Sequence, residues 1–124
     1  MINVLNLILI KAIILMPKSI IRLFAGKYVA GENHSTALST VKSLNNQGFA
    51  ATIDILGEHV SDSIEAKKVV LEYINLYDEI AENNLDCNIS IKPSHIGLDI
   101  GENIFLENLQ LLIDKAKKTK NFLR

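Results

Sequence analysis

The sequence has few of the features that stabilise a chain without a hydrophobic core or that attract nucleic acid. It contains one cysteine, two prolines and no tryptophan in 124 residues. The single cysteine, Cys87, excludes an internal disulfide and a cysteine-based zinc site, and it fits a reducing cytosol. The 13 basic residues are balanced by 14 acidic ones, which argues against nucleic acid as the main partner because backbone binding needs surplus cations.

Apolar side chains, by contrast, are abundant and make up 48% of the chain. This composition excludes a disordered, collagen-like or disulfide-stapled protein, and the length is that of one ordinary domain. No internal repeat, low-complexity stretch or linker divides the sequence. We therefore expect residues 1–124 to form a single unit, with leading helices over 1–48 and two strand–helix units over 49–124.

The amino-terminal segment is the longest apolar run. Residues 4–16 are apolar except for Asn6 and Lys11, and a run of about 13 residues is too short to span a bilayer, which needs about 20. No basic residue precedes the run and no small-residue cleavage site follows it, which argues against a secretory signal. Residues 1–31 carry basic side chains and no acid, so two interpretations stay open. The segment is a helix buried against the fold, or it contacts an anionic membrane surface peripherally from the cytoplasm.

Four further segments have apolar residues at helical spacing. They are residues 20–28, 33–47, 63–83 and 101–118. Gly48 is expected as the left-handed cap of the second of these helices. Asp62, with Glu65 three residues on, predicts a capping box at the start of the third.

Two short apolar runs, over 49–56 and 87–92, predict buried strands. The long helix between them implies a crossover and therefore parallel pairing. Alternation along each strand places its isoleucines on one face, which must pack on helices, and its other residues on the opposite face. That opposite face consists of Thr52, Asp54 and Leu56 from the first strand and Asn88, Ser90 and Lys92 from the second.

Two strands are too few for an independent sheet, because both edges stay open and the faces cannot be buried. Residues 122–124 stand where a third strand would begin. We therefore expect the opening portion of a larger α/β domain, or a fragment that pairs with a partner or with itself. The polar strand face favours a barrel interior over an open doubly wound sheet, which is apolar on both faces.

Lys92 is the main candidate for chemistry. It lies at the carboxyl end of its predicted strand, where active sites of α/β barrels are found. Asp54 lies on the neighbouring strand, and a buried charge needs a partner. The two residues therefore form either a structural ion pair or part of a functional site. Glu58 and His59 follow the first strand, so they are expected at the same end of the sheet.

Other kinds of site have little support in the sequence. His95 follows Lys92 by three positions and is expected near the same edge, whereas His34 is expected at the surface. No pair of histidines has metal-ligand spacing, so no metal site is predicted. Neither a glycine-rich phosphate loop nor a serine–histidine–acid arrangement is apparent.

Three segments carry motifs that are specific in combination. They read YVAGE at 28–32, ATIDILGEH at 51–59 and NISIKPSHIGLD at 88–99. Together they resemble the amino-terminal part of the bacterial proline dehydrogenase family, over roughly residues 24–124. The resemblance implies a distorted (βα)8 TIM-type barrel that uses FAD to oxidise L-proline to 1-pyrroline-5-carboxylate and passes electrons to membrane quinone.

The resemblance also assigns roles to residues of this chain. It implies that Lys92 pairs with the proline carboxylate, that Glu58 is an acid near the mouth that pairs with a gating arginine, and that Asp54 is a supporting group. Pro93 departs from the family, which usually has leucine there. The family's flavin contacts and its carboxylate-binding arginines come from later strands and the last helix, so no cofactor-binding residue is assigned here.

A second class of function stays open. A barrel of this type needs about 250 residues, and this chain holds two of its eight strands. The chain alone is therefore expected to be inactive and to bind FAD weakly. The alternative to an enzyme is a catalytically inert α/β fragment, or an interaction module that needs a partner to complete the barrel.

Overall fold

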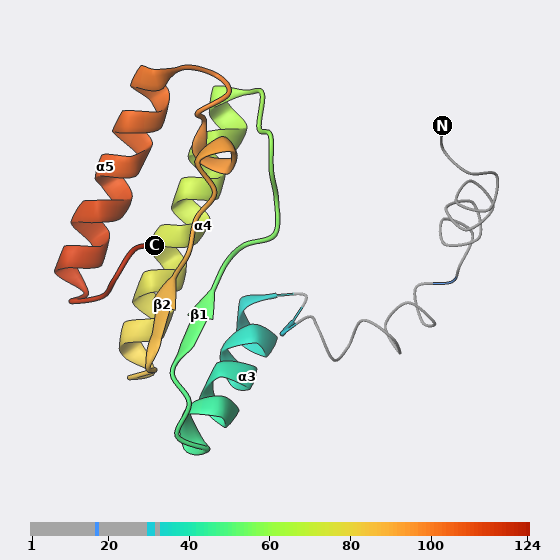
Figure 1. Cartoon of the computed structure of the whole chain (residues 1–124), viewed down its shortest axis with the longest axis vertical. Helices are drawn as coiled ribbons and strands as arrows, with labels where there is room; N and C mark the ends of the chain where they lie inside the picture. Colours follow the sequence, from blue (N-terminus) through green and yellow to red (C-terminus); the bar gives the residue numbers. More distant parts are fainter. Residues whose placement is uncertain (1–16, 18–29, 32) are drawn as a thin grey trace, which may run out of the picture.

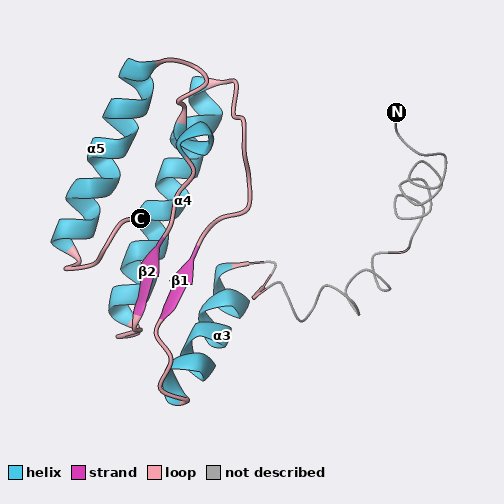
Figure 2. Cartoon of the chain, viewed as in Figure 1, coloured by secondary structure: helices cyan, strands magenta, loops and turns pink. Residues whose placement is uncertain are grey.

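Figures 1 and 2 show the computed structural model of the chain, which describes residues 17, 30–31 and 33–124. Its elements, in chain order, are α3 (His34–Asn46), β1 (Ala51–Ile53), α4 (Ser63–Glu82), β2 (Cys87–Ile89), the 3-10 helix η1 (Pro93–Ile96) and α5 (Glu102–Lys118). The helices predicted over 4–16 and 20–28 lie outside the described residues, as does nearly all of the 1–31 segment. Within the described part of the chain, no helix is long and apolar enough to cross a membrane.

The three predicted helices that fall in the described region are confirmed to within two residues at their ends. At the start of α3, the Asn33 side chain accepts the N–H of Thr36 at 3.0 Å. At its end, Gly48 has a φ of 86° and the N–H of Phe49 donates to the carbonyl of Leu44 at 3.0 Å. This is the left-handed glycine cap that the sequence predicts, with the long backbone bond that closes it.

The capping box at the start of α4 is only half formed. The carboxylate of Asp62 accepts the N–H of Ile64 at 3.2 Å, one residue earlier than a capping box requires. Among the described residues the Glu65 carboxylate accepts no hydrogen bond from the backbone N–H of Asp62, so the reciprocal half of the box is missing. Asp62 nevertheless satisfies one of the free N–H groups of the first turn.

The sheet has the predicted parallel pairing. Ala51 lies opposite Cys87, Thr52 opposite Asn88 and Ile53 opposite Ile89. On the face away from the helices, the Thr52 hydroxyl donates to Oδ1 of Asn88 at 3.0 Å.

Both strands are shorter than predicted. The regular ladder covers residues 51–53 and 87–89, whereas the sequence predicts 49–56 and 87–92. The reason is that the chain leaves the ladder after Ile53, and the N–H of Ile55 is bonded by the Tyr73 hydroxyl at 3.2 Å instead of by a strand. The alternation of exposure nevertheless continues to Leu56, so the two faces are as predicted.

Residues 122–124 form a third, very short extended segment beside β2. The N–H of Arg124 donates to the carbonyl of Ile89 at 2.8 Å, and the N–H of Ile91 donates to the carbonyl of Arg124 at 2.9 Å. Leu123 forms a parallel bridge with Ile89. The strand start predicted at this position is confirmed, and β2 is therefore paired on both sides.

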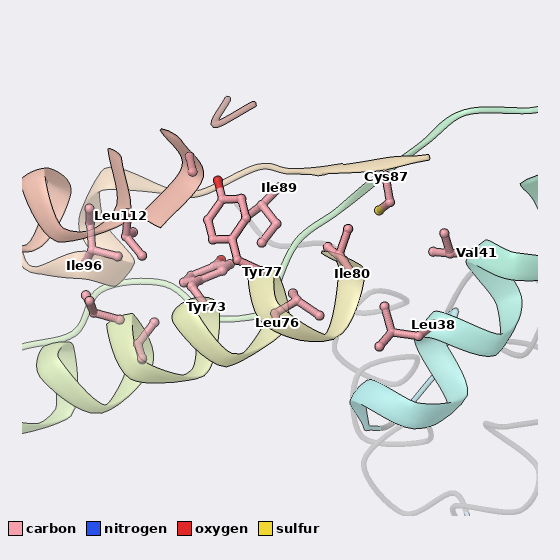
Figure 3. Packing of buried hydrophobic residues seen from close by; sticks show 13 residues of the cluster. Leu38, Val41, Tyr73, Leu76, Tyr77, Ile80, Cys87, Ile89, Ile96 and Leu112 are labelled. Carbon is pink, nitrogen blue, oxygen red and sulfur yellow. The ribbon is translucent and has the colours of Figure 1, made fainter. Parts of the chain in front are cut away.

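The core lies between the sheet and the helices. Figure 3 shows the aromatic and aliphatic side chains of α4 directed toward Ile89, with Leu112 of α5 at one end and Leu38 and Val41 of α3 at the other. Ile89 is fully buried, whereas Ile53 is partly buried. Cys87 is also buried, which raises the pKa of its thiol to about 11, so it packs as a small apolar residue.

The described elements are those of an α/β protein. In Figure 1, α4 runs behind the two strands and α5 lies beside α4, so both long helices are on one side of the sheet. The opposite side, which carries Thr52 and Asp54, is exposed. The predicted division into a helix-covered apolar face and a polar face is therefore observed.

Candidate active site

Lys92 and Glu58 form an ion pair at the carboxyl end of the sheet. Nζ of Lys92 lies 2.8 Å from Oε1 of Glu58. Lys92 ends the extended segment after β2, and Pro93 behind it occupies the first position of η1, where its missing N–H is not needed. Glu58 comes from the segment that follows β1. The sequence predicts both residues at this end, and the structure brings them into contact.

Each partner stabilises the charged form of the other. The hydrogen bond and the charge of Lys92 hold the pKa of the Glu58 carboxyl below its usual value. The same hydrogen bond raises the pKa of the Lys92 ammonium. Because an ammonium has three N–H donors and Glu58 accepts one, the partly exposed Lys92 retains donors for a second carboxylate.

The alternative pairing of Lys92 with Asp54 is wrong. Asp54 is exposed, and among the described residues it forms no ion pair. Its side chain lies on the same strand face as predicted, but it is Glu58, from the segment after β1, that reaches the ammonium. Asp54 therefore acts on Lys92 only at a distance, through a favourable charge interaction that raises the lysine pKa slightly.

A histidine–carboxylate hydrogen bond also connects the same two segments. Nδ1 of His59 lies 2.8 Å from Oδ2 of Asp99, and this bond raises the pKa of the imidazole. The N–H of Val60 also donates to the carbonyl of Ser94 at 3.3 Å. The segment that carries Glu58 is thus attached to residues 92–99 at the two positions that follow the glutamate.

His95 is the residue of this region whose position the sequence does not reveal. It is predicted near the edge of the sheet, but it is 6% exposed and lies in the interior beneath Gly57. His34, predicted at the surface, is partly buried and its Nδ1 lies 3.3 Å from Oε1 of Glu79. Only the helical phase of η1, which the sequence pattern did not predict, could have indicated that His95 points inward.

The described residues show neither an open phosphate-binding glycine beside the strand ends nor a cluster of metal ligands. Both glycines near the carboxyl ends of the strands are packed against side chains: Gly57 lies on the ring of His95, and a Cβ on Gly97 would lie 3.0 Å from Ile104. Neither leaves its backbone open for a phosphate to approach. Within residues 33–124 no group of three potential metal ligands comes together.

Comparison with known proteins bears directly on this site. No family model matches the chain. Over 97 residues, or 78% of the chain, it is 41% identical to Proline dehydrogenase 1 of Bacillus subtilis subsp. natto. It is 33% identical over 80% of its length to Proline dehydrogenase 2 of Bacillus subtilis strain 168, and 29% identical over 80% to a proline dehydrogenase of Deinococcus radiodurans.

The chain spans about a third of the length of these relatives, from 32% to 33%. An alignment of 97 residues in a chain of 124 must include the segment from Gly57 to Lys92. The resemblance found in the three sequence motifs is therefore confirmed, and it extends over the elements that carry the Glu58–Lys92 pair. Over the aligned segment the chain is therefore similar to bacterial proline dehydrogenases, and it corresponds to about one third of their length.

Proposed function

We propose that this chain forms part of an FAD-dependent proline dehydrogenase and contributes Lys92 as the group that binds the carboxylate of L-proline. The observation that carries the proposal is the position of Lys92: its ammonium lies at the carboxyl end of parallel strands, at the edge of the exposed polar face, with one donor held by Glu58. Relatives named proline dehydrogenase support the substrate.

The wider proposal follows from the same similarity. The two strands and the bridge at Leu123 would be the first strands of a distorted (βα)8 barrel, with the polar face of Thr52, Asn88 and Lys92 turned inward. The whole protein would oxidise proline in the cytoplasm, with FAD bound by residues outside the described region and quinone as the acceptor. Residues 1–31 would contact the membrane surface, and Asp54 would support the charge of Lys92.

Within this chain the proposed chemistry is electrostatic. Lys92 would neutralise the substrate carboxylate, and Glu58 would keep the ammonium charged and fixed in direction. The pKa of the Lys92 ammonium is raised by the hydrogen bond to Glu58, so Lys92 stays protonated throughout the physiological range. A lysine acts here as a point charge with several donors, so Glu58 and the substrate can be bound at the same time.

The proposal is tested in a chimaeric enzyme. In Proline dehydrogenase 1 from B. subtilis subsp. natto, the amino-terminal part that resembles residues 24–124 is replaced by residues 24–124 of this chain, and proline oxidation is measured. Replacing Lys92 by methionine keeps most of the stem and deletes the charge. Because a hydrogen bond to a charged group is lost, the KM for proline should rise by roughly 10- to 150-fold.

Lys115→Met is the matched control. Lys115 also forms an ion pair, with Asp78, but between α4 and α5 on the helical side of the sheet. Its loss should leave the KM for proline unchanged. A Lys92→Met enzyme with an unchanged KM would exclude Lys92 from the substrate site. A folded, flavin-containing chimaera that does not oxidise proline would favour the alternative, a catalytically inert module that requires a partner.

A further inference from the structure

Gly57 lies against the ring of His95 and has no space for a side chain. A Cβ on Gly57 would lie 2.2 Å from Nε2 and 2.5 Å from Cε1 of His95. Among the described glycines only Gly48 and Gly97 have a φ in the left-handed region, so the backbone conformation does not require glycine at position 57. The requirement is steric: the ring of His95 fixes how closely this segment approaches the sheet.

The ring of His95 is itself held in place from below. His95 is 6% exposed, and the ring of Tyr73 from α4 packs edge-on against it with centroids 6.4 Å apart and planes at 81°. The Tyr73 hydroxyl accepts the N–H of Ile55 at 3.2 Å and donates to the carbonyl of the same residue at 3.5 Å. Tyr73 and His95 thus support residues 55–57, immediately before Glu58.

We propose that His95 is a positioning residue. Its ring contacts Gly57 and sets how far this segment lies from the sheet, and this distance directs the Glu58 carboxylate to Lys92. This inference rests on the proposed function for its consequence in proline binding, because it assigns what holds the Glu58–Lys92 pair. The ring of His95 forms no hydrogen bond with Glu58 or Lys92. Its effect is therefore transmitted by van der Waals contact with the backbone of Gly57.

The charge state of His95 suits this role. Burial and the nearby charge of Lys92 lower the pKa of the imidazole, against the opposing charges of Glu72, Glu65 and Asp54. Nδ1 is buried and has no hydrogen-bond partner among the described residues. A neutral ring therefore fills the space under Gly57 without placing a second positive charge beside Lys92.

The experiment measures the pKa of the Glu58 carboxyl by carbon-13 NMR titration of the dilute full chain, because this pKa depends on the pairing with Lys92. Lys92→Met defines the effect of losing the pair: the pKa of Glu58 should return toward its ordinary value. Gly57→Ala should reproduce most of that rise, because the methyl group must displace the segment from the ring. Gly101→Ala is the control, since nothing lies within 4 Å of a Cβ there.

A compensating double variant separates positioning from general damage. His95→Ala alone should also raise the pKa of Glu58, because Gly57 loses its support. In Gly57→Ala/His95→Ala the methyl occupies space that the ring has left, so the pKa of Glu58 should lie closer to that of the parent chain than in either single variant. A Gly57→Ala chain with an unaltered Glu58 titration would overturn the inference, as would single shifts that simply add in the double variant.

The inference and the proposed function can fail separately. In the chimaeric enzyme, Gly57→Ala should raise the KM for proline in the same direction as Lys92→Met. If Gly57→Ala shifts the titration of Glu58 but leaves KM unchanged, His95 positions the pair and the pair does not serve proline binding. If Lys92→Met raises KM while Gly57→Ala leaves Glu58 unaltered, the proposed function stands and the positioning role of His95 is excluded.

Discussion

Two histidines close to the same strand ends have opposite electrostatic surroundings. His59 is 76% exposed and its pKa is raised by the hydrogen bond to Asp99. His95 is buried, and its pKa is lowered by desolvation and by Lys92. The two histidines therefore make the free energy of unfolding depend on pH in opposite directions. The His59–Asp99 bond stabilises the fold below the unfolded histidine value of about 6.5 and is lost as pH rises through the folded pKa. Neutral burial of His95 instead loses stability as pH falls below that value.

Proton NMR should resolve this difference in the full chain. We expect His59 to titrate above about 6.5 and His95 below it. Asp99→Asn keeps the size of the side chain and removes its charge, so it should lower the pKa of His59 and leave that of His95 in place. If the two histidines titrate together, or if Asp99→Asn moves His95 instead, the assigned surroundings of both rings are wrong.

The ends of the helices show how one backbone device is built from different residues. At the carboxyl ends of α3, α4 and α5, the left-handed position is occupied by Gly48, Asn84 and Lys120, with φ values of 86°, 50° and 54°. Each end is closed by a bond from the next N–H to the carbonyl five residues earlier, such as Asn121 to Ala116 at 2.8 Å. Glycine and asparagine tolerate this conformation, whereas in lysine it brings the Cβ unfavourably close to the following carbonyl oxygen.

Lys120→Gly should therefore stabilise the protein. Relief of the left-handed strain outweighs the added freedom of the unfolded chain, and we expect a gain of up to about 1 kcal/mol, measured by urea unfolding. The control is Lys117→Gly, in the last turn of α5 proper, which should destabilise by about 1 kcal/mol because glycine is a poor helix former. Equal effects of both substitutions would show that position 120 is not strained.

The sheet in the described part of the chain is narrow, and its one free edge is on β1. The N–H of Ala51 donates to Asp86 and the carbonyl of Ile53 accepts from Ser90, so both residues use their backbone groups toward β2. The backbone groups of Thr52, between them, point the opposite way. A free parallel edge is a template for pairing with another chain. The second edge expected to be open, on β2, is covered by residues 122–124.

We expect the chain to self-associate through this edge, as sedimentation velocity over a concentration series would detect. Thr52→Pro removes the outward N–H and should weaken association while leaving the bonds to β2 intact. Thr52→Val is the matched control: it removes the side-chain bond to Asn88 but keeps the N–H, so association should persist. A chain that stays monomeric, or equal association of both variants, would contradict pairing at this edge.

The sequence by itself determined the three helices of the described region, the parallel strand pair, the division of the sheet into two faces and the resemblance to proline dehydrogenases. Burial periodicity and caps such as Gly48 are local properties, so they can be recognised without knowing the fold. Tertiary structure alone decided that Lys92 meets Glu58 and not Asp54, and that His95 is buried under Gly57. Both depend on the path of the chain around Gly57 and Glu58, beyond the alternating residues of the first strand, where contacts with α4 and η1 set the geometry.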